Sequence, residues 1–294
     1  MKEKNRKAII LYLVLVLGYS YLFGVLELIF KNGVFYDFLG KSFTFVPVIT
    51  ALVLNKKVEK NTGGRMSLKV WKNPKALAAS AFAPGILIAM GAVLYFLVFP
   101  NEYSGVFAMG NLFEGRENTA ISNPFMFVLI CILISAVFFP IHLLELGEEV
   151  GWRGYLLWKQ KDIYGEPKAV IINGIEWGIA HLPLIYFGFN YSLDNPGAPW
   201  TNMLLMMLSC VVIGILFSYV TLKTGNCVYA AIMHGATNII GELPVYCSKS
   251  QQSGLLGPNP GGLLAMSFLF IAAAVLFILM LRTKHRQRRT KISH

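Results

Sequence analysis

The residues most able to carry out chemistry form an acidic cluster beside an apolar stretch. Glu145, Glu148 and Glu149 lie within five positions, and Arg153 follows Glu149 by four. On a helix, Glu149 and Arg153 share one face in the favourable acid-first order, so they can neutralise each other. Glu148 then lies on a neighbouring face without its own cation, which suits a general base or acid. The alternative interpretation is a salt-bridge cluster at a helix end.

Two further polar pairs lie in apolar segments downstream. Trp177 and His181 are four residues apart, so the indole can pack beside the imidazole and fix its orientation. His234 and Asn238 have the same spacing and present two hydrogen-bonding groups on one helical face. Each pair alone is also compatible with a structural hydrogen bond between packed helices. Glu176 has no local partner, and we expect it to pair with a Lys or Arg of another helix.

Together these side chains provide the materials for one hydrolytic site. A glutamate and a histidine can activate a water molecule, and a histidine and an asparagine can stabilise an oxyanion. The same groups are also materials for a divalent metal site, such as a zinc site of the His–His–Glu kind. Its candidate ligands are Glu148, Glu149, His181 and His234. The sequence contains no H-E-x-x-H motif of the zinc proteases, and we interpret the nearby His142 as a bystander.

The elements that position these residues are predicted to be membrane helices. Of the 294 residues, 55% are hydrophobic and 14% are charged, whereas soluble domains carry roughly 25% charged residues. A helical span needs about 20 mainly apolar residues. Eight segments approach this criterion: Ala8–Phe30, Tyr36–Leu54, Ala76–Phe99, Pro124–Leu146, Ala169–Phe189, Met203–Leu222, Val228–Tyr246 and Leu263–Leu281. The sequence therefore predicts an all-α, polytopic membrane bundle of about eight helices. It forms a single domain over residues 1–294, with the motifs at about 142–240.

The charge between these segments predicts their orientation. The basic residues behind the net charge of +11 gather at the two ends and in the gaps between apolar runs. With a cytoplasmic N-terminus, loop 55–75, loop 153–168 and the basic tail 282–294 all fall inside, and the glutamate-containing loop 100–123 falls outside. We therefore predict a multi-pass protein of the cell membrane with both termini cytoplasmic. Its partner is the lipid bilayer and not nucleic acid. On this topology Glu148 lies near the cytoplasmic end of its span, and the site is expected to open toward the cytoplasm.

The three polar motifs resemble those of a known family. The motifs are Glu148-Glu149-x-x-x-Arg153, Trp177-x-x-x-His181 and His234-x-x-x-Asn238. In this order they are similar to the motifs of the CAAX prenyl endopeptidase and bacteriocin-processing (CPBP) family of intramembrane proteases. The resemblance covers about the middle third of the chain. Trp177 departs from the phenylalanine more usual in the family but keeps an aromatic ring.

The resemblance implies an eight-helix fold with a conical cavity and hydrolysis of a peptide bond in a membrane-embedded or lipid-linked peptide or protein. It implies that Glu148 and His181 activate the attacking water. It also implies that His234 and Asn238 stabilise the oxyanion, while Glu149 and its arginine hold the helix end. A zinc-bound water would need nearly the same residues, and we favour glutamate-based chemistry.

Two other classes of function compete with a protease. The first is a non-catalytic membrane scaffold or bacteriocin-immunity protein, in which the motif residues would serve helix packing. The second is a transporter with an ionisable site at mid-membrane. The transporter is disfavoured, because the sequence shows no internal repeat and no pair of broken helices.

Overall fold

The computed structural model describes residues 2–58, 67–104, 124–137, 139–241, 243–250 and 254–292. Its helices are α1 (Lys2–Phe30), α2 (Val34–Ser42), α3 (Phe45–Val58), α4 (Pro74–Val98), α5 (Pro124–Val137), α6 (Phe139–Glu149), the π-helix η4 (Val150–Leu156), α7 (Leu157–Tyr164), α8 (Glu166–Tyr186), α9 (Trp200–Thr224), α10 (Val228–Gly241), α11 (Leu243–Tyr246) and α12 (Ser267–Ile292). Two short 3₁₀ turns, Val70–Lys72 and Pro100–Glu102, complete the elements. Among the described residues the β-contacts amount to one isolated bridge, Tyr103 with Ser248. The all-α prediction is confirmed.

Length and composition make this a multi-pass helical membrane protein. Within the described ranges, four helices are long and apolar enough to cross a membrane, namely α1, α4, α8 and α9. The bent pair α2–α3 would make a fifth, and α12 contains a shorter apolar stretch, Ser267–Thr283. Each of the eight predicted segments falls on one helix or on consecutive helices. The count of eight spans, however, is not confirmed and stays a prediction.

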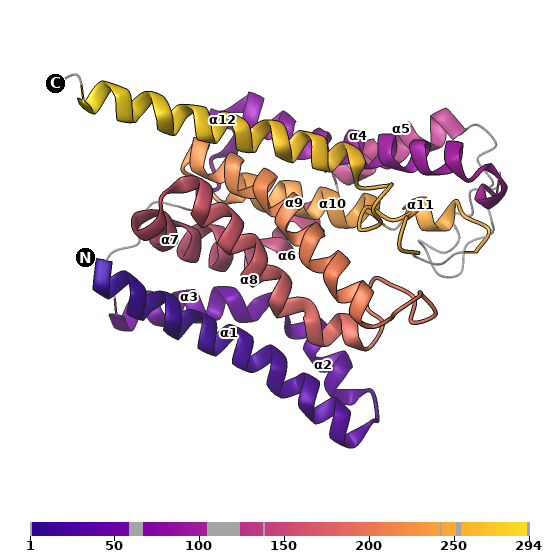
Figure 1. The fold of residues 1–294 in the computed structure, drawn as a ribbon, viewed down its shortest axis with the longest axis horizontal. Helices are drawn as coiled ribbons and strands as arrows, with labels where there is room; N and C mark the ends of the chain where they lie inside the picture. The colour runs from indigo at the N-terminus through magenta and orange to yellow at the C-terminus, as the bar shows by residue number, and fades with distance from the viewer. Residues whose placement is uncertain are drawn as a thin grey trace.

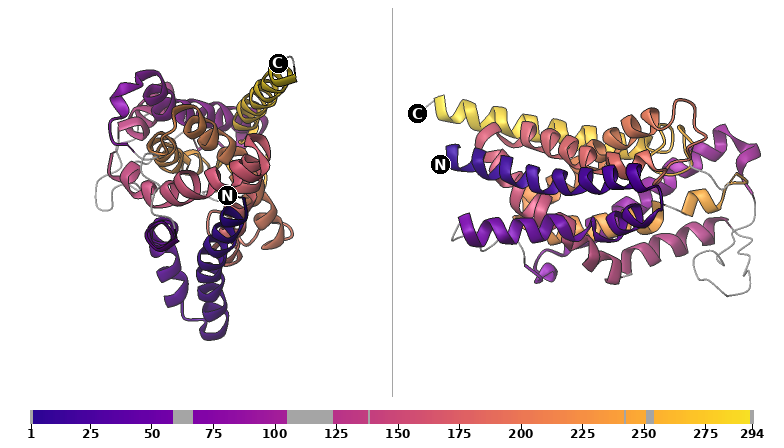
Figure 2. Two further views of the ribbon diagram at one scale, coloured as in Figure 1. Left: turned by 90° about the vertical axis from the view of Figure 1, so that its left-hand side faces the viewer. Right: turned by 90° about the horizontal axis from the view of Figure 1, so that it is seen from below.

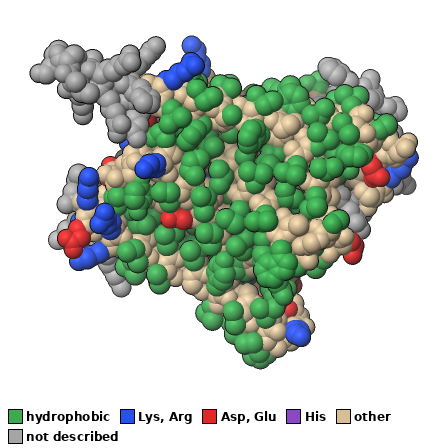
Figure 3. Space-filling model, viewed as in Figure 1, with side chains coloured by type: hydrophobic (Ala, Val, Ile, Leu, Met, Phe, Trp, Pro, Cys, Tyr) green, Lys and Arg blue, Asp and Glu red, His purple; other side chains and the backbone are tan. Residues whose placement is uncertain are grey.

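The distribution of side chains on the surface fits a bilayer around the middle of the bundle. Hydrophobic side chains cover most of the face shown in Figure 3, and the charged side chains gather mainly at its two ends. The beginning of α1 and the end of α12 lie at the same end of the bundle (Figure 1). This agrees with the prediction that both termini share one side, while the cytoplasmic orientation stays a prediction. Residues 59–66, 105–123, 293 and 294, on which part of the charge argument rests, lie outside the described residues, as does the side chain of His142.

Helices α8, α9 and α10 form the centre of the bundle. Helix α8 packs along α9, and α10 packs against α4, α6 and α9. Helices α1 to α3 form a separate wing that covers α7, α8 and η4 from one side (Figure 2). The bend between α2 and α3 is 59°, and the elbow at Phe43 and Thr44 lines a cavity between the helices.

The acidic cluster does not lie at the end of its helix. The sequence placed the end of this span at Leu146, but α6 continues through η4 into α7 and ends only at Tyr164. The polar side chains are tolerated within the continuous helix because α3, α8 and α10 cover it and supply partners. Glu148 consequently lies in the interior of the bundle, where α8 can bring His181 to it. The helix therefore ends later than predicted, while the position of Glu148 near the cytoplasmic end of its span stays a prediction.

Glycines allow this helix to approach the wing closely. A Cβ added at Gly151 would lie 2.5 Å from Cβ of Pro47 and 2.5 Å from the hydroxyl of Tyr12. A Cβ at Gly147 would collide with the carbonyl oxygen of Thr44. Since Thr44 belongs to the α2–α3 elbow and Pro47 to the first turn of α3, these glycines set the position of the elbow relative to the acidic cluster.

Gly151→Ala is therefore expected to destabilise the protein. Overpacking in a filled interior lowers the free energy of unfolding by about 1–3 kcal/mol, which thermal unfolding in detergent would detect as a lower Tm. Gly18→Ala is the matched control, because no atom lies within 4 Å of a Cβ added at Gly18. If both variants melt at the wild-type temperature, the close approach at Gly151 is not a real constraint.

Candidate active site

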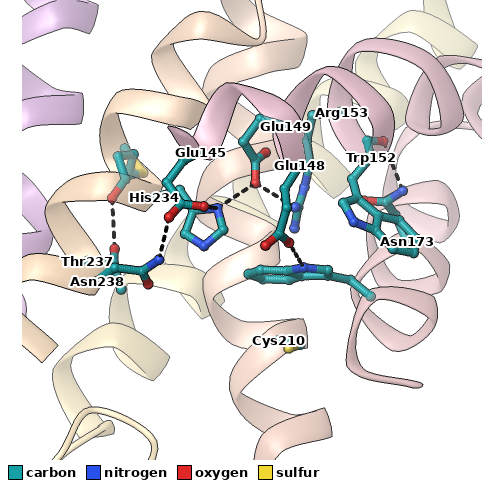
Figure 4. Close-up of polar contacts among 12 residues, drawn as sticks. Glu145, Glu148, Glu149, Trp152, Arg153, Asn173, Cys210, His234, Thr237 and Asn238 are labelled. Atoms are coloured by element: carbon teal, nitrogen blue, oxygen red, sulfur yellow. Dashed lines mark hydrogen bonds and ion pairs between the residues drawn. The ribbon is translucent and has the colours of Figure 1, made fainter. Parts of the chain in front are cut away.

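The acidic cluster lies on the side of α6 that faces α10 and the middle of α8 (Figure 4). Glu145, Glu148 and Glu149 are three and four residues apart, which places them side by side on the helix. Their exposed fractions are 7%, 5% and 0%. Buried carboxylates are unfavourable unless they are paired or hydrogen-bonded. The partner of each glutamate therefore determines what it can do.

Glu149 is held by Arg153, as the spacing predicted. Arg153 Nη1 donates to Glu149 Oε1 over 2.8 Å, and both side chains are fully buried. The guanidinium also lies 4.3 Å from the centroid of the Trp177 ring and 5.4 Å from that of Phe217. The pair is neutral as a unit, and its cation lies against the rings of Trp177 and Phe217.

Glu145 and Glu149 together hold the polar residues of α10. Asn238 Nδ2 donates to Glu145 Oε1 over 2.9 Å. His234 Nδ1 lies 3.0 Å from Glu149 Oε1 and 3.3 Å from Glu145 Oε2. Sequence reasoning gave Glu145 no role of its own. The signal was its position four residues before Glu149, which places it on the same face of the helix.

Glu148 has a different partner, Trp177. The indole Nε1–H donates to Glu148 Oε2 over 2.7 Å. The backbone carbonyl of Trp177 lies 2.8 Å from His181 Nδ1, and its ring centroid lies 5.4 Å from that of His181 and 5.3 Å from that of His234. The predicted packing of Trp177 beside His181 is present. The hydrogen bond to Glu148 was not predicted. It depends on the indole N–H, which phenylalanine lacks.

A cavity of about 390 Å³ adjoins these groups. It is lined by Glu145, Glu148, Trp177, His181, His234 and Asn238, so the three predicted motifs share one space. Its other walls include the α2–α3 elbow, where the Phe43 ring centroid lies 4.6 Å from that of His181. The predicted catalytic residues are thus brought together, while their roles stay predictions.

The cavity extends away from the termini. Loops 189–191 and 259–261 line it, and Asn259 Nδ2 donates to the carbonyl of Asn190 over 3.0 Å, which ties the two loops together. Both loops lie at the end of the bundle opposite the start of α1 (Figure 1). The cavity and the termini therefore do not lie on the same side, so the two predictions of a cytoplasmic opening and cytoplasmic termini do not hold together. Both rested on loop charge, which placed Glu148 near the cytoplasmic end of its span.

A metal could be held by only part of the predicted ligand set. Among the described residues, the ligand atoms of Glu145, Glu148 and His234 lie within 4.8 Å of one another. This group contains carboxylate oxygens and an imidazole nitrogen, which suit a divalent ion such as zinc. Glu149 and His181, which the sequence also suggested, are not members of it. Glu149 is instead engaged by Arg153 and His234.

Glu176 lies apart from this group. Its Oε2 accepts a short hydrogen bond from Gln160 Nε2, and Gln160 Oε1 accepts from Asn173 Nδ2 over 3.2 Å. Asn173 Nδ2 also donates to the carbonyl of Trp152 in the π-helix, over 3.2 Å. The expected Lys or Arg partner is replaced by an amide of α7. Glu176 therefore supports the junction of η4 and α8, and it does not line the cavity.

Comparison with known proteins supports the motif assignment. Residues 120–240 match the sequence model of the family described as "Type II CAAX prenyl endopeptidase Rce1-like". A protein of Methanococcus maripaludis named "CAAX prenyl protease 2" is 25% identical to the chain over 198 residues, which cover 67% of this chain and 69% of that protein. The family resemblance inferred from the three motifs is confirmed, and the matched region contains all of them.

The Glu149–Arg153 pair gives a test of the site's architecture. Arg153→Met would leave Glu149 buried without its cation, which typically costs about 3–5 kcal/mol of stability. The double variant Arg153→Met/Glu149→Gln removes both charges and is expected to recover a large part of that loss. Thermal unfolding in detergent measures both effects. A single variant as stable as the wild type would show that the pair is not buried as described.

Proposed function

Because the centre of the chain matches the Rce1-like CAAX prenyl endopeptidases, we propose that the protein is an intramembrane endopeptidase that hydrolyses a peptide bond in a membrane-associated peptide or protein. The observation that supports this most directly is the division of partners among the three glutamates. Glu149 contacts a cation and Glu145 holds the α10 side chains, while Glu148 faces the cavity with a single neutral hydrogen-bond donor. A carboxylate in that position can accept a proton from water.

Glu148 and His181 form the water-activating pair in this proposal. The carbonyl of Trp177 can only accept a hydrogen bond, so His181 Nδ1 carries the proton and its Nε2 keeps a lone pair. The indole N–H fixes Glu148 from the same residue. A water in the cavity between the two side chains would lose its proton to Glu148 as its oxygen attacks the carbonyl carbon of the substrate. The proton then passes to the leaving amine.

His234 and Asn238 form the oxyanion-stabilising pair in this proposal. Each is held on one side by the α6 glutamates, and each lines the cavity on the other. Asn238 Nδ2 has a second hydrogen that is not used by Glu145. His234 donates from Nδ1 to the glutamates, and as an imidazolium it also donates from Nε2. Donors aimed at the position of the developing negative charge stabilise the tetrahedral intermediate.

The substrate is proposed to be lipid-associated. The named relative is a CAAX prenyl protease, and a prenylated peptide with a C-terminal CAAX sequence is accordingly the first probe to use. A lipid anchor would keep such a peptide at the bilayer that surrounds the helices. A cavity of about 390 Å³ accommodates a short extended segment and not a folded domain.

The proposed chemistry is of the glutamate type. A bound divalent ion would be held by Glu145, Glu148 and His234, and it would act as a Lewis acid on water. However, two of these residues, Glu145 and His234, also contact each other, and Glu145 holds Asn238. In the glutamate-type chemistry proposed here, these contacts orient the α10 side chains and Glu148 is left to accept the proton.

Substitution of the water-activating pair tests the proposal. Glu148→Gln, Glu148→Ala and His181→Ala are each expected to reduce cleavage of a prenylated or membrane peptide by roughly a thousandfold or more, with folding retained. Glu176→Gln is the matched control, because this carboxylate is also interhelical but lies outside the cavity. It should keep activity within about threefold of the wild type.

Full cleavage by Glu148→Ala or His181→Ala would overturn the assignment. If these variants instead only lowered the thermal stability, with no cleavage activity to lose, the motif residues would serve packing in a scaffold or immunity protein. Solute flux into proteoliposomes that depends on Glu148 would support a transporter.

Chelation tests the type of chemistry. Purified protein treated with 1,10-phenanthroline is expected to retain cleavage within about twofold, since the proposed proton acceptor is a side chain. Metal analysis of the same sample should show less than one equivalent of zinc. Loss of cleavage that added zinc restores would assign a metal-dependent mechanism instead.

A further inference from the structure

Glu145 makes contacts that the three motifs do not explain. Resting on the proposed function, we infer that Glu145 is a positioning residue that holds Asn238, and with it His234, in the orientation that stabilises the oxyanion. It lies outside each of the three sequence motifs, and its role follows from the pairing of α6 with α10.

The contact with Asn238 fixes which way the amide points. A carboxylate can only accept hydrogen bonds, so the atom facing Glu145 Oε1 at 2.9 Å is the amide nitrogen of Asn238. One N–H of the amide donates to Glu145, and the second N–H remains available to another acceptor. The amide oxygen, which would repel an oxyanion, is turned away from Glu145.

The difference in burial between the two residues gives this bond its importance. Asn238 is exposed, whereas Glu145 is 7% exposed. An exposed asparagine that makes no strong bond samples several side-chain conformations, and a donor that is not preorganised stabilises a transition state poorly. The buried carboxylate therefore anchors an otherwise free amide at the rim of the cavity.

The second oxygen of Glu145 faces the other member of the pair. Glu145 Oε2 lies 3.3 Å from His234 Nδ1, on the side where Glu149 Oε1 lies at 3.0 Å. Glu149 is also bound by Arg153. Glu145 thus bridges the two residues of α10, which are one helical turn apart, and fixes their positions relative to each other.

A graded series of variants tests this role in the full-length protein. Glu145→Gln keeps an oxygen that can accept from Asn238, whereas Glu145→Leu removes the acceptor at similar volume. We expect Glu145→Leu to lower kcat by roughly a hundredfold, with KM changed by less than about threefold. Glu145→Gln should recover at least about tenfold of that loss. Glu176→Gln again serves as the matched carboxylate control.

A double-mutant cycle separates positioning from general stability. In the Asn238→Ala background the oriented amide is already absent, so adding Glu145→Leu should lower kcat by less than about fivefold. Independent, multiplicative losses in the cycle would contradict the inference. So would a Glu145→Leu variant with wild-type kcat, or a Glu145→Gln variant as inactive as Glu145→Leu.

The same experiment distinguishes failure of this inference from failure of the proposed function. If Glu148→Ala is inactive while Glu145→Leu is fully active, only the role of Glu145 is refuted. If Glu148→Ala is fully active, the endopeptidase mechanism itself is refuted, and with it the role assigned to Glu145.

Discussion

The structure depends on one constraint, namely that three carboxylates on a single buried helical face must each find a different partner. Glu149 takes the guanidinium of Arg153, Glu145 takes the α10 side chains, and Glu148 takes an indole N–H. These partners come from the same helix, from α10 and from α8, so satisfying the carboxylates fixes how three elements pack. Buried polar groups in an apolar interior must be hydrogen-bonded or paired. Meeting this requirement for the three carboxylates also assembles the site.

Trp177 connects the two halves of the site. Its N–H and its carbonyl hold Glu148 and His181. Its ring packs edge-on against both histidines, and the guanidinium of Arg153 lies over its face. Small residues make this arrangement possible on the other side of the helix. Gly147 and Gly151 let α6 and η4 approach the α2–α3 elbow, which closes the cavity with Phe43. The position of the acidic face is thus set by the large ring of Trp177 on one side of the helix and by two glycines on the other.

The sequence predicted what local spacing and apolar length can determine. The helical class follows from the length of the apolar segments, and the Glu149–Arg153 pair and the packing of Trp177 against His181 follow from residues four apart. The failures have a common cause, because they concern partners chosen between distant helices. Gln160 as the partner of Glu176 and Asn238 as the partner of Glu145 depend on tertiary packing. The continuation of α6 into α7 was missed because of the lower hydropathy of α7.

The π-helix η4 has a consequence for how this chain can vary. A π-turn closes over one residue more than an α-turn, so each of its residues corresponds to less than the ~100° of rotation of an α-helical residue. The additional residue is therefore largely absorbed within one wide turn. Removing one residue between Val150 and Leu156 would restore α-helical geometry and leave Gln160 on nearly the same side of the helix. Across related chains, this stretch should accordingly tolerate a one-residue difference in length, and a single gap here in an alignment would leave the polar face of α7 in place.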